Sequence, residues 1–200
     1  MIALVRGELY RVATIRSSWI SSIVLGVLTM MLGWLSVDMW KLLVGMGAFG
    51  LAAMQTAQHY QHQTAVLLHL GRPNRLLALV AQLIAGVIVT LAFAALSGVT
   101  VLGKGHVEHY RDALVVVPLM AVFATAAATI LRRPTWLFLS SGAWFIIIEG
   151  LISTLEKPWP FTAFLQASAG DRLHLLIFAG WVTLAVVGAI VAIHRDLVGE

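Results

Sequence analysis

Two histidines, three glutamines and a tyrosine stand together in the stretch QHYQHQT, which begins at Gln58 between two strongly apolar segments. His59 and His62 are three residues apart, so one face of a helix would carry both imidazoles, and His69 would join them if the helix continued. Imidazole is the commonest side-chain ligand of transition metals. No carboxylate accompanies these histidines and the chain has no cysteine. We therefore expect protein contacts here rather than a metal site.

Sequences that resemble nucleotide-binding motifs occur twice, and neither has the context that such a site needs. Residues 45–50 read GMGAFG inside an apolar segment without a strand, where glycines favour close approach of a neighbouring helix. Residues 98–105 read GVTVLGKG, which puts Gly105 where a hydroxyl should bind magnesium. With no H-E-x-x-H or G-x-S-x-G sequence either, we expect this chain to have no cofactor and no enzymatic activity of its own.

Glu149 is the carboxylate nearest the middle of an apolar segment. Acidic residues within membrane spans are functional candidates, so Glu149 is a candidate for a substrate path. The alternative is a hydrated position close to the outer interface.

The composition indicates a membrane protein. The chain has 200 residues, of which 60% are hydrophobic and 11% charged, and its mean hydropathy is +0.92. These values exclude an ordinary water-soluble domain, and a span needs about 20 apolar residues. We predict one all-α polytopic domain over residues 1–200 with six transmembrane helices, at about 18–37, 41–57, 76–102, 113–131, 135–153 and 173–193.

The first residues form a separate pattern. Ile2, Val5, Leu9 and Val12 recur at helical spacing, which predicts an amphipathic helix over residues 1–16 lying in the membrane interface. The apolar segment that follows lacks a small-residue cleavage site, so we expect an uncleaved first span rather than a signal peptide.

Basic residues orient the chain. Cytoplasmic loops carry an excess of lysine and arginine, so the arginine-rich side is cytoplasmic, both termini lie there and the loop at 104–112 faces outward. The formal charge of +4 is therefore an orientation signal in a cell-membrane protein, and we expect no nucleic-acid partner. The side with the termini receives Arg6, Arg11, Arg16, Arg72, Arg75, Arg132, Arg133 and Arg195, and the other receives Lys41, Lys104, Arg111, Lys157 and Arg172.

The polar stretch lies at the cytoplasmic end of the predicted second span. Pro73 and Asn74 then interrupt helical structure before the third span. The apolar sequence TAVLLHL at residues 64–70, between the polar stretch and Pro73, suits a short helix on the membrane surface. We interpret this cytoplasmic loop as a solvent-exposed docking element.

At this loop the chain resembles the type-2 permease family of ATP-binding cassette exporters. Members often carry an acidic or polar residue, then Gly-Thr, a few apolar residues, Pro, a small residue and Arg before the third span. The matching positions here are Thr64, Leu67, Leu68, Pro73 and Arg75, whereas Gln58 stands where Glu is common and Gln63 where Gly is common.

The resemblance implies a short cytoplasmic coupling helix between spans two and three, within residues 58–70. It implies a cytoplasmic ATP-binding cassette partner that binds ATP and Mg²⁺, and a second six-span subunit, identical or different, in contact with membrane lipid. The chain would move a hydrophobic or amphipathic cargo, such as a drug, a lipid or a peptide. The implied coupling residues are Gln58, His59, Tyr60, Gln61, His62, Gln63, Glu8 and Arg11.

Two other classes of function stay open. A non-catalytic membrane assembly or immunity protein would have the same spans without an ATPase partner. A lipid-modifying membrane enzyme would need a polar cluster at one interface, and the candidates are Gln58, His59, His62 and Arg72.

Overall fold

The computed structural model describes residues 1–61 and 75–195, with the side chains of these ranges except those of residues 16–18, 59–61 and 75. The described chain is helical along nearly all of its length, and no β-strand occurs in either range. The all-α fold class expected from the sequence is therefore confirmed.

Long helices follow one another along the chain, and shorter ones join or interrupt them. The described helices are α1 (Ile2–Thr14), α2 (Arg16–Leu35), α3 (Val37–Gln61), α5 (Arg75–Ser97), α6 (Val99–Gly103), α7 (Val107–Leu131), α8 (Pro134–Ala143), the π-helical η1 (Trp144–Ile152), α9 (Pro160–Ser168) and α10 (Arg172–Arg195).

Several helical segments are long and apolar enough to cross a membrane, as expected of a helical membrane protein. Within the described residues they number five, or six if α1 and α2 are counted together as one bent span. The exact number of six spans therefore stays a prediction. The five segments are Val37–Gln58, Leu76–Gly103, Val107–Leu131, Pro134–Ile152 and Arg172–Arg195.

Helices α1 and α2 form an elbow. Ile15 between them has an extended backbone, with φ −78° and ψ 108°, and the two helices are bent by 77° relative to each other. None of the residues of α1 is buried. A separate N-terminal helix is thus present, whereas its location in the membrane interface stays a prediction.

Two helices begin earlier than hydropathy predicts. α7 begins at Val107 rather than at 113, with Glu108 in its first turn, where a carboxylate interacts favourably with the helix dipole. The outer loop expected at 104–112 is therefore a short turn followed by helix. α3 likewise begins at Val37. Both helices begin before their apolar segments, because a polar first turn suits the membrane surface.

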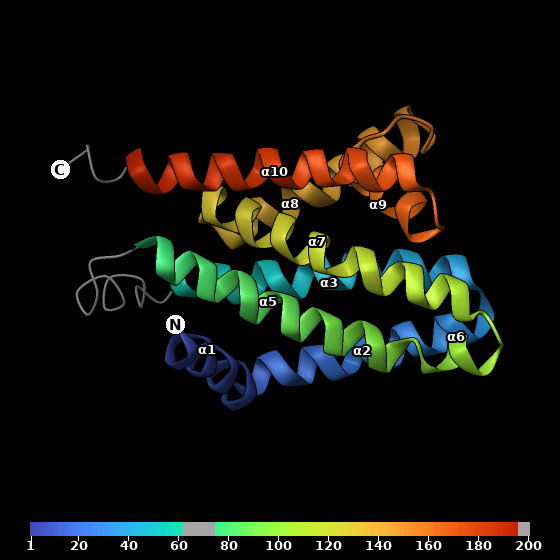
Figure 1. The fold of residues 1–200 in the computed structure, drawn as a ribbon, viewed down its shortest axis with the longest axis horizontal. Coiled ribbons are helices and arrows are strands. Elements are labelled where there is room, and N and C mark those ends of the chain that lie inside the picture. Colours follow the sequence, from blue (N-terminus) through green and yellow to red (C-terminus); the bar gives the residue numbers. More distant parts are fainter. Residues whose placement is uncertain (62–74, 196–200) are drawn as a thin grey trace.

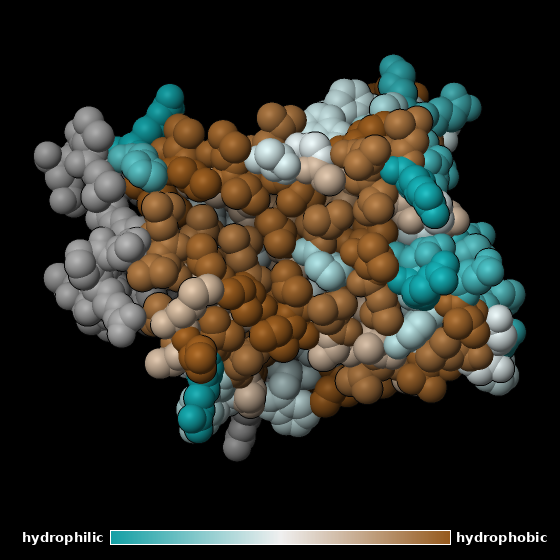
Figure 2. Space-filling view, in the orientation of Figure 1, coloured by the Kyte–Doolittle hydropathy of each residue, from teal (hydrophilic) through white to brown (hydrophobic). Residues whose placement is uncertain are grey.

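The long helices run along the longest dimension of the molecule (Figure 1). α1 and the last turn of α10 lie at one end, and α6 and α9 lie at the other. Apolar residues cover most of the visible face between these ends, and hydrophilic residues gather at the end with α6 and α9 (Figure 2). An apolar face bordered at one end by hydrophilic residues suits a helix bundle that lies in a bilayer.

Glycines on α3 make room for aromatic rings from other helices. A Cβ atom on Gly47 would lie 2.7 Å from the ring of Phe93 on α5, and one on Gly45 would overlap the ring of Phe164 on α9. The expected role of GMGAFG in close helix packing therefore holds for these two glycines. It does not hold for Gly50, where a Cβ would meet nothing within 4 Å.

Candidate functional site

The carboxylate of Glu149 is fully buried, on the π-helical turn η1 near the end of the molecule that carries α9. Its Oε1 accepts hydrogen bonds from the Trp144 indole at 2.9 Å and from the Phe161 amide at 3.2 Å. Its Oε2 accepts from the Thr162 amide at 2.6 Å and from the Thr162 hydroxyl at 2.8 Å. Four donors of this chain therefore hold one carboxylate.

These contacts serve the N-terminus of α9. The first amides of a helix have no carbonyl partner within it, and negative charge is favourable there. Trp159, the residue before α9, provides no side-chain cap. The carboxylate of Glu149 instead accepts hydrogen bonds from the amides of Phe161 and Thr162, which have no partner within the helix. The structure thus shows Glu149 anchoring α9, and its assignment to a substrate path stays a prediction.

The π-helical geometry of η1 positions this anchor. In a π-helix the backbone hydrogen bonds join residues five apart, so side chains at that spacing lie on one face. Trp144 and Glu149 have this spacing and are hydrogen-bonded to each other. The Trp144 ring also packs edge-on against Trp159, with centroids 5.3 Å apart. The distorted turn therefore directs the carboxylate toward α9.

Helix α9 was missed by the sequence prediction because nine residues are too few for a span. Its signals are present nevertheless. Pro160 stands at the first helical position, where its fixed φ is favourable, and Gly170 follows the helix with φ +98°. Phe161 and Phe164 are buried, and α9 packs against α3, α7 and α10. It is therefore part of the core.

At the end with the termini, α1 is tied to α3. The Arg11 guanidinium donates a 2.8 Å hydrogen bond to the backbone carbonyl of Gln55 and forms a 3.1 Å ion pair with Glu8. Arg11 and Glu8 side chains are 23% and 11% exposed, so the pair is shielded from water. Two of the predicted coupling residues are thus brought together beside the end of α3.

The polar stretch QHYQHQT begins as a continuation of α3, which ends at Gln61. Gln58 is buried, with 8% of its surface exposed, so the expectation of a solvent-exposed stretch is wrong for this residue. The side chains of His59, Tyr60 and Gln61 are not described. His62 and Gln63 lie outside the described residues. The same holds for residues 62–70 of the segment in which the coupling helix is expected, so that helix stays a prediction.

Of the two histidines expected in the outer loop, His109 lies in a helix, whereas His106 is the residue that precedes α7. His109 belongs to α7, its ring centroid is 6.2 Å from that of His106, and its Nδ1 is buried without a partner. Within residues 1–61 and 75–195, no group of three or more His, Cys, Asp or Glu side chains is placed to hold a metal ion.

Comparison with known proteins does not assign the chain to a family. No protein-family model matches the sequence, and no curated protein matches it significantly.

Proposed function

We propose that this chain is the membrane-spanning subunit of an ATP-driven exporter in the cell membrane, with both termini in the cytoplasm. ATP and Mg²⁺ are bound by a separate cytoplasmic ATPase subunit, and a second six-span subunit, identical or different, completes the transport path in the lipid bilayer. The observation that carries this proposal is the hydrogen bond from Arg11 on α1 to the Gln55 carbonyl on α3.

This bond supports a coupling role for the arginine-rich end. The polar residues 58–61 continue α3 only three residues beyond Gln55, so a partner that displaces them displaces the segment to which α1 is tied. α3 in turn packs against α2, α5, α7, α8 and α9. Movement at its end would therefore reach most of the bundle as a rigid-body shift, which is how domain rearrangements are commonly transmitted.

The cargo is hydrophobic or amphipathic in this proposal. Ion and proton pathways usually contain ionisable side chains inside the spans. Lys41 and Glu149 are the buried ionisable residues of the described helices, and each has partners in this chain: Lys41 pairs with Asp38 at 3.0 Å, and Glu149 anchors α9. A drug, lipid or peptide suits such an apolar bundle better than an inorganic ion.

Purification of the tagged protein in mild detergent tests the proposal. A stoichiometric partner with phosphate-binding ATPase motifs, whose activity rises when the two chains are reconstituted together, is the expected result. An assembly or immunity protein would instead bring a partner without ATPase motifs. A lipid-modifying enzyme would convert lipid in vesicles without any partner, and either result would overturn the proposal.

A further inference from the structure

The elbow between α1 and α2 borders a hollow in the surface of the bundle. Its volume is about 480 Å³ and it opens to the surface between α1, α2 and α5, with α3 at its floor. A cleft of this size is in the range that accommodates small-molecule ligands. Its walls are formed chiefly by Leu9, Trp19, Ile23, Ile88, Phe93 and Leu96.

The lining of this α1–α2–α5 groove is almost entirely hydrocarbon. Ser22 and Ser97 are its hydroxyl-bearing residues, and the Ser97 hydroxyl already donates to the Ala94 carbonyl at 3.3 Å. Gly26 lies in the wall, where a Cβ atom would meet only the Phe93 ring at 4.0 Å. A ligand in the groove would therefore have to be a hydrocarbon chain or another slender apolar group.

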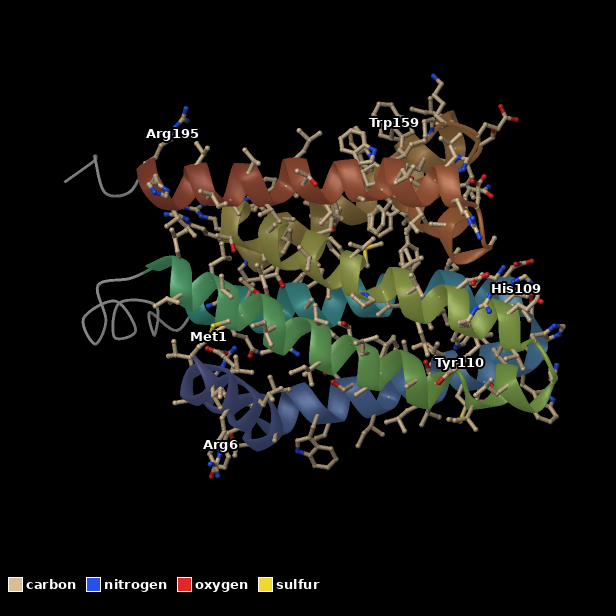
Figure 3. The ribbon with its side chains drawn as sticks, in the orientation of Figure 1. Met1, Arg6, His109, Tyr110, Trp159 and Arg195 are labelled. Atoms are coloured by element: carbon tan, nitrogen blue, oxygen red, sulfur yellow. The ribbon has the colours of Figure 1, made fainter. Side chains whose placement is uncertain are left out.

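An arginine lies on α1 one turn before the part of this helix that lines the groove. Arg6, Leu9 and Ala13 follow one another at helical spacing and share a face of α1, and Leu9 and Ala13 line the groove. Arg6 is exposed and extends away from the bundle (Figure 3). Its guanidinium is therefore exposed on α1, and if α1 lies in the membrane interface as predicted, it is at the level of the lipid headgroups. The end of the groove near Met30 and Leu96 is apolar.

We propose that the groove binds one acyl chain of an anionic phospholipid, whose phosphate is held by Arg6. An aliphatic cleft matches the chain, and an exposed guanidinium one helical turn before the groove-lining residue Leu9 matches a negative headgroup. The binding is independent of the transport function proposed above. It concerns a membrane lipid that stays with the protein, and it needs neither ATP nor a partner subunit.

The test is native mass spectrometry of the delipidated protein titrated with phosphatidylglycerol. Wild type should retain one phosphatidylglycerol in preference to phosphatidylcholine. Gly26→Phe and Ala92→Phe place a ring in the groove from opposite walls, and each should weaken retention about tenfold, equivalent to about 1.4 kcal/mol. Arg6→Gln should weaken the retention of phosphatidylglycerol about fivefold and leave the retention of phosphatidylcholine unchanged. Gly180→Phe is the matched control, since a Cβ on exposed Gly180 meets nothing within 4 Å.

Elution volume and thermal unfolding identify variants that fail to fold. The two groove variants lie on different helices, so the test can still be made if one of them does not fold. Wild-type retention in folded Gly26→Phe and Ala92→Phe would overturn the proposal. So would equal retention of phosphatidylcholine and phosphatidylglycerol by wild type. If the groove variants instead abolish a dimer while lipid retention is unchanged, the groove is a contact between copies and the lipid proposal is wrong.

Discussion

Glu149 and Thr162 are joined by two hydrogen bonds, one from the Thr162 amide at 2.6 Å and one from its hydroxyl at 2.8 Å. Glu149 lies on η1 and Thr162 on α9, so this pair joins the two ends of the connection between these helices. The carboxylate has no cationic partner among these contacts, and amide dipoles at the start of α9 stabilise its charge. One side chain therefore links η1 to the first turn of α9.

Replacing Glu149 with Gln should loosen α9. The glutamine amide group is a donor and would face the donors of Phe161 and Thr162, leaving at least one buried group unsatisfied. Such a loss costs about 1–3 kcal/mol. We expect a lower unfolding temperature in detergent and faster amide hydrogen exchange over Pro160–Ser168.

Glu156→Gln is the matched control, because Glu156 is exposed on the same connection. It should leave both measurements unchanged. Equal exchange rates over α9 in wild type and Glu149→Gln would show that the carboxylate does not hold this helix.

The long helices could be predicted because hydropathy reports which segments avoid water. Their ends could not, since the first turn of α7 is polar and still helical: Glu108 suits the helix dipole there. The π-helical turn that begins at Trp144 was not predicted either, because no local sequence pattern indicates it, and the contact of Trp144 with Trp159 crosses a connection between helices. The pattern of apolar residues along the sequence predicts which segments avoid water, but it does not predict how the helices pack against one another.

The candidate site was predicted in part. Glu149 was identified because a carboxylate within an apolar segment is unusual, whereas its partners in α9 required the three-dimensional arrangement. Arg11 and Glu8 lie three residues apart, and their pairing could be foreseen from that spacing. The bond from Arg11 to the Gln55 carbonyl spans 44 positions of sequence, and no local pattern indicates it.

Replacing Arg11 with Gln should release α1 from α3. The variant loses the bond to the Gln55 carbonyl and the ion pair with Glu8, at a cost of about 1 kcal/mol for a partly exposed group. Spin labels on Gly7→Cys and Met54→Cys should then give a broader distance distribution than in the same labelled protein with Arg11. Arg6→Gln, on the exposed face of α1, is the control. An unchanged distribution in the Arg11 variant would argue against the tie.

Asp171 caps α10 through its charge. Its carboxylate accepts from the His174 ring at 2.7 Å and from the amides of Leu173 and His174 at 2.8 and 3.3 Å. The hydrogen bond from the His174 side chain, followed by that from the His174 amide, lowers the pKa of Asp171 below its ordinary value of 3.8. The folded state thus prefers the ionised form, so this stabilisation is present above pH 3.8 and is lost as pH falls through the lowered pKa.

Asp171→Asn tests this directly, because asparagine is also a good cap but carries no charge. Wild type should be the more stable protein near neutral pH, and the difference in unfolding temperature should shrink as pH falls below 3.8. A difference that grows toward acidic pH would have the wrong sign for a lowered pKa.

Cysteine labelling tests the orientation, because the chain has no cysteine of its own. His106 is exposed at the end opposite α1, whereas Gly7 is exposed on α1. A membrane-impermeant maleimide should label His106→Cys on intact cells and Gly7→Cys only after permeabilisation. Labelling of position 106 only from inside would invert the proposed topology.

If the proposed function is right, the polar end of α3 should couple this chain to the ATPase subunit proposed above. The sequence contains no complete G-x-x-x-x-G-K-[ST] motif for binding phosphate. The stretch at 58–63 is polar where the membrane needs nothing polar, and it belongs to the arginine-rich end. Gln58 is buried, so its replacement would test folding rather than docking. Tyr60→Asp with His62→Asp would instead place charge in the docking interface, at a cost of about 2–5 kcal/mol if that interface excludes water.

This double variant should elute as a folded species and lose partner assembly or substrate-stimulated ATPase activity in reconstituted vesicles. His106→Asp, at the opposite end of the molecule, is the control and should retain both. If the double variant keeps full ATPase stimulation and transport, residues 58–63 do not couple the two chains. The docking surface would then have to be sought around Glu8, Arg11 or Arg132, where α1 meets α3 and α7 meets α10.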